Sequence, residues 1–206
     1  MKHIYSVTVF LTALAMIPLS AELVLEDFES YIDTSSLQMD VFTFGSAAQA
    51  GKPSLAEGLG ENGTNAACFN LTWETGNNAN LSFINLSPNT RNLSGYSEIA
   101  AFVHIEAYPS SAGFAEASVP TIVKLAVEGI DGTIWQTRSV RAEKPPVNSS
   151  YTLRFRLLPS DMERIEGKSS LKATLSDIKN IRLRFENTRK AGFRQDAYID
   201  SVVAIQ

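Results

Sequence analysis

The stretch TIVKLAVEGI (residues 121–130), DG (131–132) and TIWQTRSVR (133–141) decides the fold of this chain. Its two outer segments are rich in β-branched and apolar residues, which favour extended strands. Asp131-Gly132 between them is a strong signal for a tight hairpin turn. The stretch therefore predicts two strands that lie side by side and run antiparallel.

Short runs of the same kind recur on both sides of this hairpin. They cover residues 22–31, 65–73, 80–86, 98–106, 151–157, 179–186 and 197–205. Turn signals such as Gly76-Asn77-Asn78 and Pro145-Pro146 separate several of them. Residues 45–65 are interpreted as a loop or weak edge, and residues 161–177 as containing a helical turn. Eight or nine short strands predict an all-β fold, a two-sheet antiparallel sandwich.

The apolar positions of these runs predict the core between the sheets. The alternation is disturbed in residues 22–31, which indicates a bulge or strand end near Asp27. The residues expected to face the core are Phe28, Phe102, Leu125, Val127, Phe155, Leu183, Phe185, Ile199 and Val203.

The first 21 residues predict an export signal. Lys2 is followed by an apolar run over residues 4–19, and Leu19-Ser20-Ala21 places small residues at a cleavage point. The alternative is a membrane anchor, but the run is shorter than the roughly 20 residues that a span needs, and Pro18 interrupts its end. We expect a signal peptide over residues 1–21, a single domain over residues 22–206 beginning at Glu22, and a secreted, periplasmic or cell-surface location.

The composition of the chain argues against two kinds of partner, nucleic acid and the interior of a membrane. The chain has 18 basic and 22 acidic residues and no basic cluster, so we expect no nucleic-acid partner. After residue 21 no stretch is long and apolar enough to predict a membrane span. The single cysteine, Cys68, forms no internal disulfide; it is either a small buried hydrophobe or a nucleophile.

Four short motifs carry a resemblance to a known group. They are LEDFESY (25–31), LSGYSEI (93–99), SDIKNIRL (176–183) and AYIDSVVAI (197–205). In this order and spacing they resemble the galactose-binding-like β-sandwich superfamily of carbohydrate-binding modules. The resemblance implies a jelly-roll sandwich with neighbouring first and last strands, and a non-catalytic glycan-binding role.

The resemblance also implies a structural calcium ion between the first and last strands. The matching acids are Glu29 and Asp200, with Asp27 as a third candidate. Calcium prefers carboxylate and carbonyl oxygens, which these positions offer. The alternative is that the acids are solvated or cap amide groups of loops.

Catalytic motifs are missing from the sequence. His104 is the only histidine after residue 21, and it has no nucleophile motif beside it. One histidine and one cysteine are too few for a zinc site, and no phosphate-binding loop occurs. Glycoside hydrolysis needs two acids across a bond, and folding could still bring such a pair together. A glycan-active enzyme therefore remains an alternative.

A glycan site would pair an exposed aromatic ring with planar polar groups, and Trp73 and Trp135 are the candidate rings. Either tryptophan is alternatively part of the core. If Trp135 shares the apolar face of residues 121–130, Trp73 is the better platform. The opposite face then carries Lys124, Glu128, Gln136 and Arg138. The reverse register exposes Trp135 but turns the charged residues inward, which costs free energy.

These observations lead to one main hypothesis and two alternatives. The main hypothesis is a secreted, non-catalytic carbohydrate-binding-like protein that holds a polysaccharide weakly on a polar and aromatic sheet face. The first alternative is a structural or adhesive surface protein, for which an exposed apolar patch is typical. The second is a glycan-active enzyme, which needs two convergent carboxylates in a groove.

Overall fold

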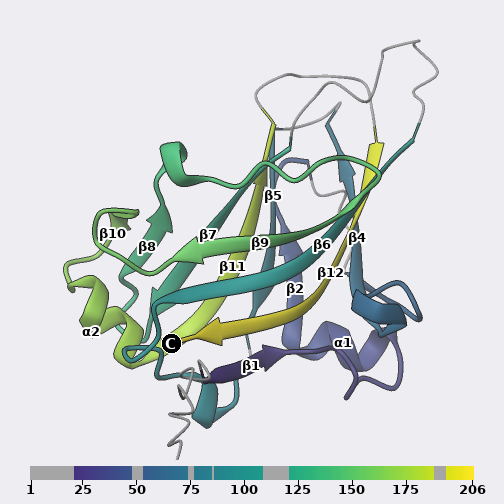
Figure 1. Ribbon diagram of the computed structural model, residues 1–206. Helices are drawn as coiled ribbons and strands as arrows, with labels where there is room; N and C mark the ends of the chain where they lie inside the picture. Colours follow the sequence, from purple (N-terminus) through teal and green to yellow (C-terminus); the bar gives the residue numbers. More distant parts are fainter. Residues whose placement is uncertain (1–20, 48–52, 74–76, 85, 109–120, 188–193) are drawn as a thin grey trace, which may run out of the picture.

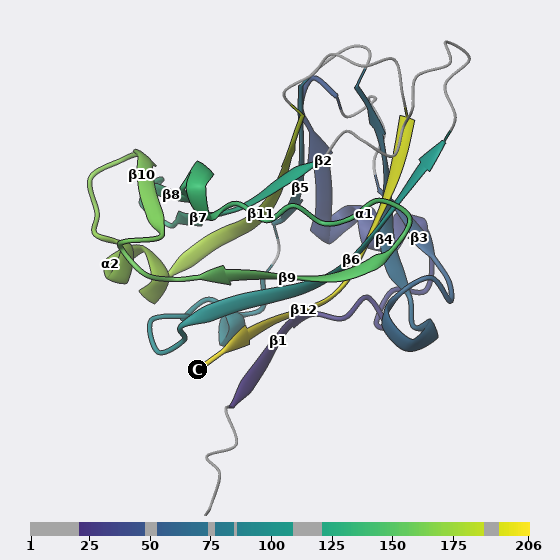
Figure 2. The same cartoon turned by 45° about the horizontal axis from the view of Figure 1, so that its top comes forward.

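The fold is an all-β sandwich of two antiparallel sheets, as the sequence predicts (Figure 1). The computed structural model describes residues 21–47, 53–73, 77–84, 86–108, 121–187 and 194–206. Within these residues each sheet has six strands. Both views show β9, β6 and β12 stacked in front of β7, β11 and β5, so the two sheets form separate layers (Figures 1 and 2).

The first sheet contains both ends of the described chain. Its order is β3 (Ser54–Ala56), β4 (Ala66–Thr72), β12 (Arg194–Ile205), β6 (Glu98–Tyr108) and β9 (Ser150–Arg156), and β1 (Glu22–Glu26) also pairs with β12. Glu22 lies opposite Ile205, which confirms that the first and last strands are neighbours. The register of β1 shifts between Val24 and Glu26, close to the bulge expected near Asp27.

The second sheet contains the hairpin. Its order is β10 (Met162–Glu166), β8 (Ile134–Thr137), β7 (Ile122–Gly129), β11 (Ile178–Glu186), β5 (Asn78–Phe83) and β2 (Val41–Phe44). At the turn, Thr133 N donates to Asp131 Oδ1 over 2.9 Å, and Gly132 has φ +79°, a conformation that glycine adopts without strain. The predicted strand 133–141 is shorter than expected, because Ser139–Arg141 form the one-turn helix η4.

Short helices connect the strands. They are α1 (Thr34–Asp40), α2 (Leu171–Ser176), and the one-turn helices η1 (Glu61–Gly63) and η2 (Pro88–Thr90). Asp33 and Ser170 cap the two α-helices by accepting from Ser36 N and Ala173 N. The predicted helical turn in residues 161–177 corresponds to α2, but β10 precedes it. The region 45–65, interpreted as a loop, contains β3 and η1. Among the described helices none is long and apolar enough to cross a bilayer.

The core lies between the facing sides of the sheets. Phe69 of the first sheet meets Phe185 of the second edge-on, with ring centroids 5.1 Å apart. Seven of the nine predicted core residues are buried: Phe28, Leu125, Val127, Phe155, Leu183, Phe185 and Ile199.

Two of the core predictions are wrong. Phe102 is half-buried on the outer side of β6, because Ala101 and Val103 on either side of it point into the core. Val203 is also half-buried. The pairing of β12 with β6 shifts between Asp200 and Val203, so Val202 and Ala204 face the core instead.

Candidate functional site

The outer face of the second sheet gathers polar side chains from four neighbouring strands. Strand pairing fixes this, because residues opposite one another point to the same side of a sheet. Arg184 lies opposite both Lys124 and Asn80, and Asn80 lies opposite Phe44. We name this surface the polar face. Its exposed and half-buried members are Phe42, Phe44, Arg182, Arg184 and Glu186. Its buried members, which lie among them, are Asn80, Ser82, Lys124, Glu128, Gln136 and Asn180.

Glu128 is the centre of one cluster on the polar face. Its carboxylate accepts from Lys179 Nζ over 2.9 Å and from Asn180 Nδ2 over 2.8 Å, and it also pairs with Arg182. Burial raises the pKa of the Glu128 carboxyl, but these hydrogen bonds and the Arg182 charge outweigh burial and hold the pKa below its usual value. Glu128 is therefore a fixed carboxylate that accepts hydrogen bonds.

Glu186 forms the second cluster on the polar face. Its two carboxylate oxygens pair separately with Lys124 Nζ, over 2.8 Å, and with Arg184 Nε, over 2.6 Å. Only 9% of the Lys124 side chain is exposed, so this cation is held inside the array of side chains. Opposite charges held by several partners are ordered before any ligand arrives, which lowers the entropy cost of binding.

An aromatic pair forms the part of the polar face at the edge strand β2. The rings of Phe42 and Phe44 are stacked, with centroids 6.2 Å apart, and 46% and 39% of these residues is exposed. The Arg182 guanidinium lies 5.7 Å from the centroid of the Phe44 ring. The site therefore combines a flat apolar surface with planar hydrogen-bonding groups. The sequence analysis missed both rings, although VFTF (41–44) consists of β-branched and aromatic residues, which favour strands.

Three of the four predicted polar residues lie together on the polar face. Val127 is opposite Trp135, and Ala126 is opposite Gln136, which settles the hairpin register in the first of the two predicted ways. Lys124, Glu128 and Gln136 consequently share the outer side. Arg138 is just beyond the end of β8, where its Nε donates to the Met162 carbonyl over 3.0 Å.

Neither tryptophan lies on the polar face, so the expectation of an exposed tryptophan platform there is wrong. Trp73 is fully buried, and its indole N–H donates to Gln195 Oε1 over 2.8 Å. Trp135 is half-buried on the core side of β8 and donates to the Ser169 carbonyl over 3.2 Å. Both rings follow the common pattern in which a packed tryptophan finds an acceptor for its N–H.

Two of the three acids proposed to hold calcium, Glu29 and Asp200, meet at one loop. Asp200 is buried, and its Oδ2 accepts from Glu61 N over 2.9 Å and from Thr64 Oγ1 over 2.5 Å. Glu29 Oε1 accepts from Asn65 N over 2.5 Å in the same loop. Asp27 is farther along the chain from this loop and accepts from Glu29 N over 3.2 Å.

The oxygen atoms at this loop fit the chemistry of calcium. A Cβ atom built on Gly60 would lie within 2.7 Å of Asp200 Oδ2, the Asn65 carbonyl oxygen and Thr64 Oγ1. Carboxylate, carbonyl and hydroxyl oxygens are the donors that Ca²⁺ takes. No three His, Cys, Asp or Glu side chains gather as a metal-binding group among the described residues. The acids also cap loop amides, so calcium stays a prediction.

Within the part of the chain that the structure describes, His104 and Cys68 do not contact each other: each lies opposite Tyr198, on different strands beside β12. His104 lies on the outer side of β6, with its ring 6.0 Å from that of Tyr198. Cys68 is half-buried, and burial together with the nearby Asp196 charge raises the pKa of its thiol to about 11. The thiol is therefore protonated at neutral pH, which argues against a nucleophilic role.

Comparison with known proteins finds similar folds among solved structures. No family model and no curated protein matches the sequence. Among solved structures, the family 11 carbohydrate-binding module of a cellulosomal cellulase from Clostridium thermocellum is similar, with TM-score 0.56 and 15% identity over 90% of this chain and 94% of that one. A family 11 carbohydrate-binding module from Clostridium thermocellum in complex with a β-1,3-1,4-mixed-linked tetrasaccharide has TM-score 0.56 and 17% identity over 89% of this chain and 95% of that one.

Enzyme chains are also similar over part of their length. An exo-β-agarase matches with TM-score 0.53 and 15% identity, over 89% of this chain but only 24% of the agarase chain. At these identities the likeness shows the fold. The chain therefore has the β-sandwich architecture of carbohydrate-binding modules, which confirms the fold expected from the resemblance.

Proposed function

We propose that this protein is an exported, non-catalytic carbohydrate-binding protein that holds a polysaccharide weakly on its polar face. The observation that carries the proposal is the position of Arg182. Its guanidinium joins the exposed Phe44 ring to the Glu128 cluster, so an apolar platform and ordered polar groups form one surface. A sugar presents the same two features, an apolar C–H face and a rim of hydroxyl groups.

The free energy of such binding is small. Each hydrogen bond to a sugar hydroxyl replaces one to water and nets about 1 kcal/mol. The rings of Phe42 and Phe44 add a modest apolar contact, because both are already partly covered. We expect dissociation constants in the micromolar to millimolar range, about −8 to −4 kcal/mol.

The similar solved structures support a glycan as the ligand class. One of them is a module in complex with a β-1,3-1,4-linked tetrasaccharide, and others are agarases that contain a domain of this fold. These relationships rest on the fold, so the polar face of this chain has to be tested directly. Mixed-linkage β-glucan and agarose are the first ligands to test.

The electrostatics of the polar face support binding without turnover. Glycoside hydrolysis needs one carboxyl that is protonated at the working pH. Glu128 has a lowered pKa, and Glu186 is paired with two cations. The lowered pKa of Glu128 does not favour a proton donor. The second alternative from the sequence, a glycan-active enzyme, therefore finds no support in this cluster.

Export rests on the N-terminal pattern, whose residues 1–20 lie outside the described residues. Sequencing the N-terminus of protein secreted by its native host should return Glu22. Recovery of Met1 from secreted material would contradict cleavage and the proposed location.

Calorimetric titration and pull-down against a panel of glycans test the binding proposal. We expect saturable binding to at least one polysaccharide with no increase in reducing ends during long incubation. Release of reducing ends would indicate the enzyme alternative. Failure to bind any member of a broad panel would favour the surface-interaction alternative.

A further inference from the structure

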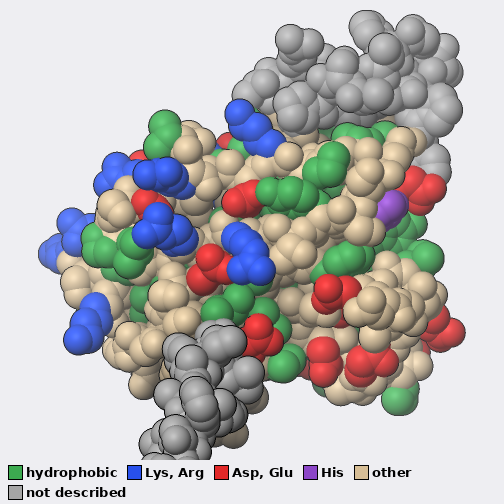
Figure 3. Space-filling view, viewed as in Figure 1, with side chains coloured by type: hydrophobic (Ala, Val, Ile, Leu, Met, Phe, Trp, Pro, Cys, Tyr) green, Lys and Arg blue, Asp and Glu red, His purple; other side chains and the backbone are tan. Residues whose placement is uncertain are grey.

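Positive charge is concentrated on one side of this acidic protein. The chain has a net charge of −4, yet most Lys and Arg side chains in Figure 3 lie where Figure 1 draws β8, β10 and α2. In the same view, most Asp and Glu side chains lie away from these elements, toward the other end of the molecule. Exposed cations of η4, β10, α2 and the chain next to these elements include Arg138, Arg141, Arg164, Lys168 and Lys172, and exposed Arg156 ends β9.

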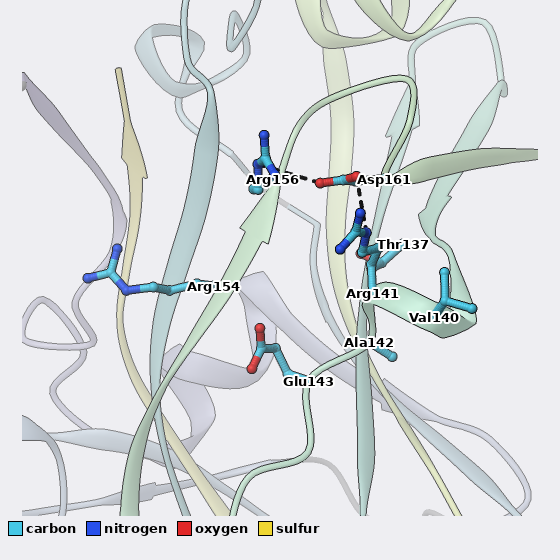
Figure 4. A pocket seen from close by; sticks show the side chains of 8 residues that line it. All are labelled: Thr137, Val140, Arg141, Ala142, Glu143, Arg154, Arg156 and Asp161. Atoms are coloured by element: carbon cyan, nitrogen blue, oxygen red, sulfur yellow. Dashed lines mark ion pairs between the residues drawn. The ribbon is translucent and has the colours of Figure 1, made fainter.

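A pocket of about 320 Å³ lies on this basic side, between η4 and the edge strand β9. Figure 4 shows its lining residues, which are Thr137, Val140, Arg141, Ala142, Glu143, Arg154, Arg156 and Asp161. The pocket is distinct from the polar face, because β9 belongs to the first sheet and η4 follows the end of β8.

Two guanidinium groups are fixed at this pocket by one buried carboxylate. Asp161 Oδ1 is 3.3 Å from Arg141 Nε, and Asp161 Oδ2 is 3.5 Å from Arg156 Nε. Only 4% of the Asp161 side chain is exposed, against 58% and 60% for the two arginines. Figure 4 shows the two guanidinium groups on either side of Asp161. Asp161 thus orients both groups while leaving more than half of each in contact with solvent.

Such a pair suits an oxyanion. A guanidinium carries five N–H donors in a planar fork that matches carboxylate and sulfate oxygens. In each arginine it is Nε that forms the ion pair with Asp161. Arg154 does not belong to this pair. Its guanidinium points away from Asp161 in Figure 4 and pairs with Glu98. Val140, which is 85% exposed, adds an apolar surface at the pocket.

We propose that Arg141 and Arg156 form a second binding site, which takes a carboxylate or sulfate group of an acidic polysaccharide. The polysaccharide as carrier rests on the proposed function, whereas the oxyanion preference rests on this pocket alone. Uronate carboxylates and sugar sulfates share the required chemistry. The basic side around the pocket would attract a chain of such groups over a distance of about 10 Å at ordinary ionic strength.

Titration with four ligands tests the proposal: polygalacturonate for carboxylate, carrageenan for sulfate, mixed-linkage β-glucan as a neutral chain, and inorganic phosphate as a free anion. The variants are Arg141→Gln, Arg156→Gln and Arg141→Lys, with Lys172→Gln as a control that removes one positive charge from the same side but outside the pocket. Melting temperatures establish that each variant is folded.

We expect at least one acidic polysaccharide to bind, and each Arg→Gln variant to weaken this binding tenfold or more. Arg141→Lys should bind at an intermediate level, because it keeps the charge without the fork. Lys172→Gln should stay within about twofold of the wild type. The acidic polymer that binds more tightly identifies the oxyanion.

Three outcomes would overturn the inference. The first is that neither acidic polymer binds. The second is that the arginine variants and Lys172→Gln lose equal affinity for the acidic polymer. The third is that phosphate binds as tightly as the polymers, which would indicate a site for free anions. The β-glucan titration reports on the polar face independently. Failure of β-glucan and of every other neutral glycan in the panel would count against the proposed function, and not against the arginine pocket.

Discussion

Arg182 lies over Phe44, with its guanidinium 5.7 Å from the ring centroid, and the same guanidinium pairs with Glu128. The contact joins the edge strand β2 to the centre of the second sheet. A cation held against an aromatic face contributes about 0.5–2 kcal/mol, depending on how well it is desolvated. The ring and the polar cluster should therefore act as one surface toward a ligand.

Replacing Phe44 by Ala tests this surface. The change removes the platform and the contact with Arg182, so we expect glycan affinity to fall about tenfold, or about 1.4 kcal/mol. Calorimetric titration measures the loss. Ile130→Ala is the control, because Ile130 is an exposed apolar residue at the β7–β8 turn. An equal loss in both variants would place the binding surface elsewhere.

Calcium should stabilise the protein through Asp200. An ion that binds only the folded state raises stability by mass action, so excess calcium should raise the melting temperature. Asp200→Ala should abolish the calcium-dependent increment, which thermal melts in calcium and in chelator measure. Glu57→Ala, an exposed acid that precedes the same loop, should retain the increment. Identical wild-type curves in calcium and chelator would leave the acids as caps of loop amides.

Two phenylalanines of the first sheet should differ sharply in their effect on stability. Phe155 is 1% exposed, and Phe155→Ala should lower the free energy of unfolding by about 3–5 kcal/mol, because it opens a cavity. Phe102 is half-buried on the outer side of β6, and Phe102→Ala should cost about 1 kcal/mol. Urea denaturation compares the two, and similar losses would contradict the observed alternation of β6.

Glu26 should make stability depend on pH. Burial raises the pKa of its carboxyl above the usual 4.5, although hydrogen bonds from Phe28 N and Tyr31 oppose the shift. The folded state then binds the proton more tightly than the unfolded state, so this contribution is present below pH 4.5 and is lost as the pH rises through the folded-state pKa. As the pH rises from 4.5 through the folded-state pKa, the free energy of unfolding of the wild type should therefore fall relative to that of Glu26→Gln.

Glu128 should make stability depend on pH in the opposite direction. Its folded-state pKa is lowered, so its contribution is present above the usual value and is lost as the pH falls through the folded-state pKa. The advantage of wild type over Glu128→Gln should therefore shrink in acid. Urea denaturation at a series of pH values measures both slopes. Parallel pH profiles for the wild type and both variants would rule out these assignments.

The hairpin shows how much of the fold local sequence predicts. Asp131-Gly132 and the composition of the segments on either side of it predict the turn and the two strands, because turn geometry and the two-residue period are local properties. The sequence left two registers open for Lys124 and Glu128, and the pairing of Val127 with Trp135 decides between them. The meeting of first and last strands was expected from the resemblance of their motifs. The resemblance also led to Asp200, which lies at a loop with several oxygen donors.

Local sequence accounts for the formation of the strands and for the alternation of residues along each of them. Only the tertiary structure decided that Trp73 is internal, that Phe42 and Phe44 lie at an open edge, and that Arg141 and Arg156 share Asp161. The physical reason is that a two-residue period gives two faces without saying which one meets the other sheet. Strand order, edges and irregularities such as the shift in β12 are set by pairing between residues far apart in the chain.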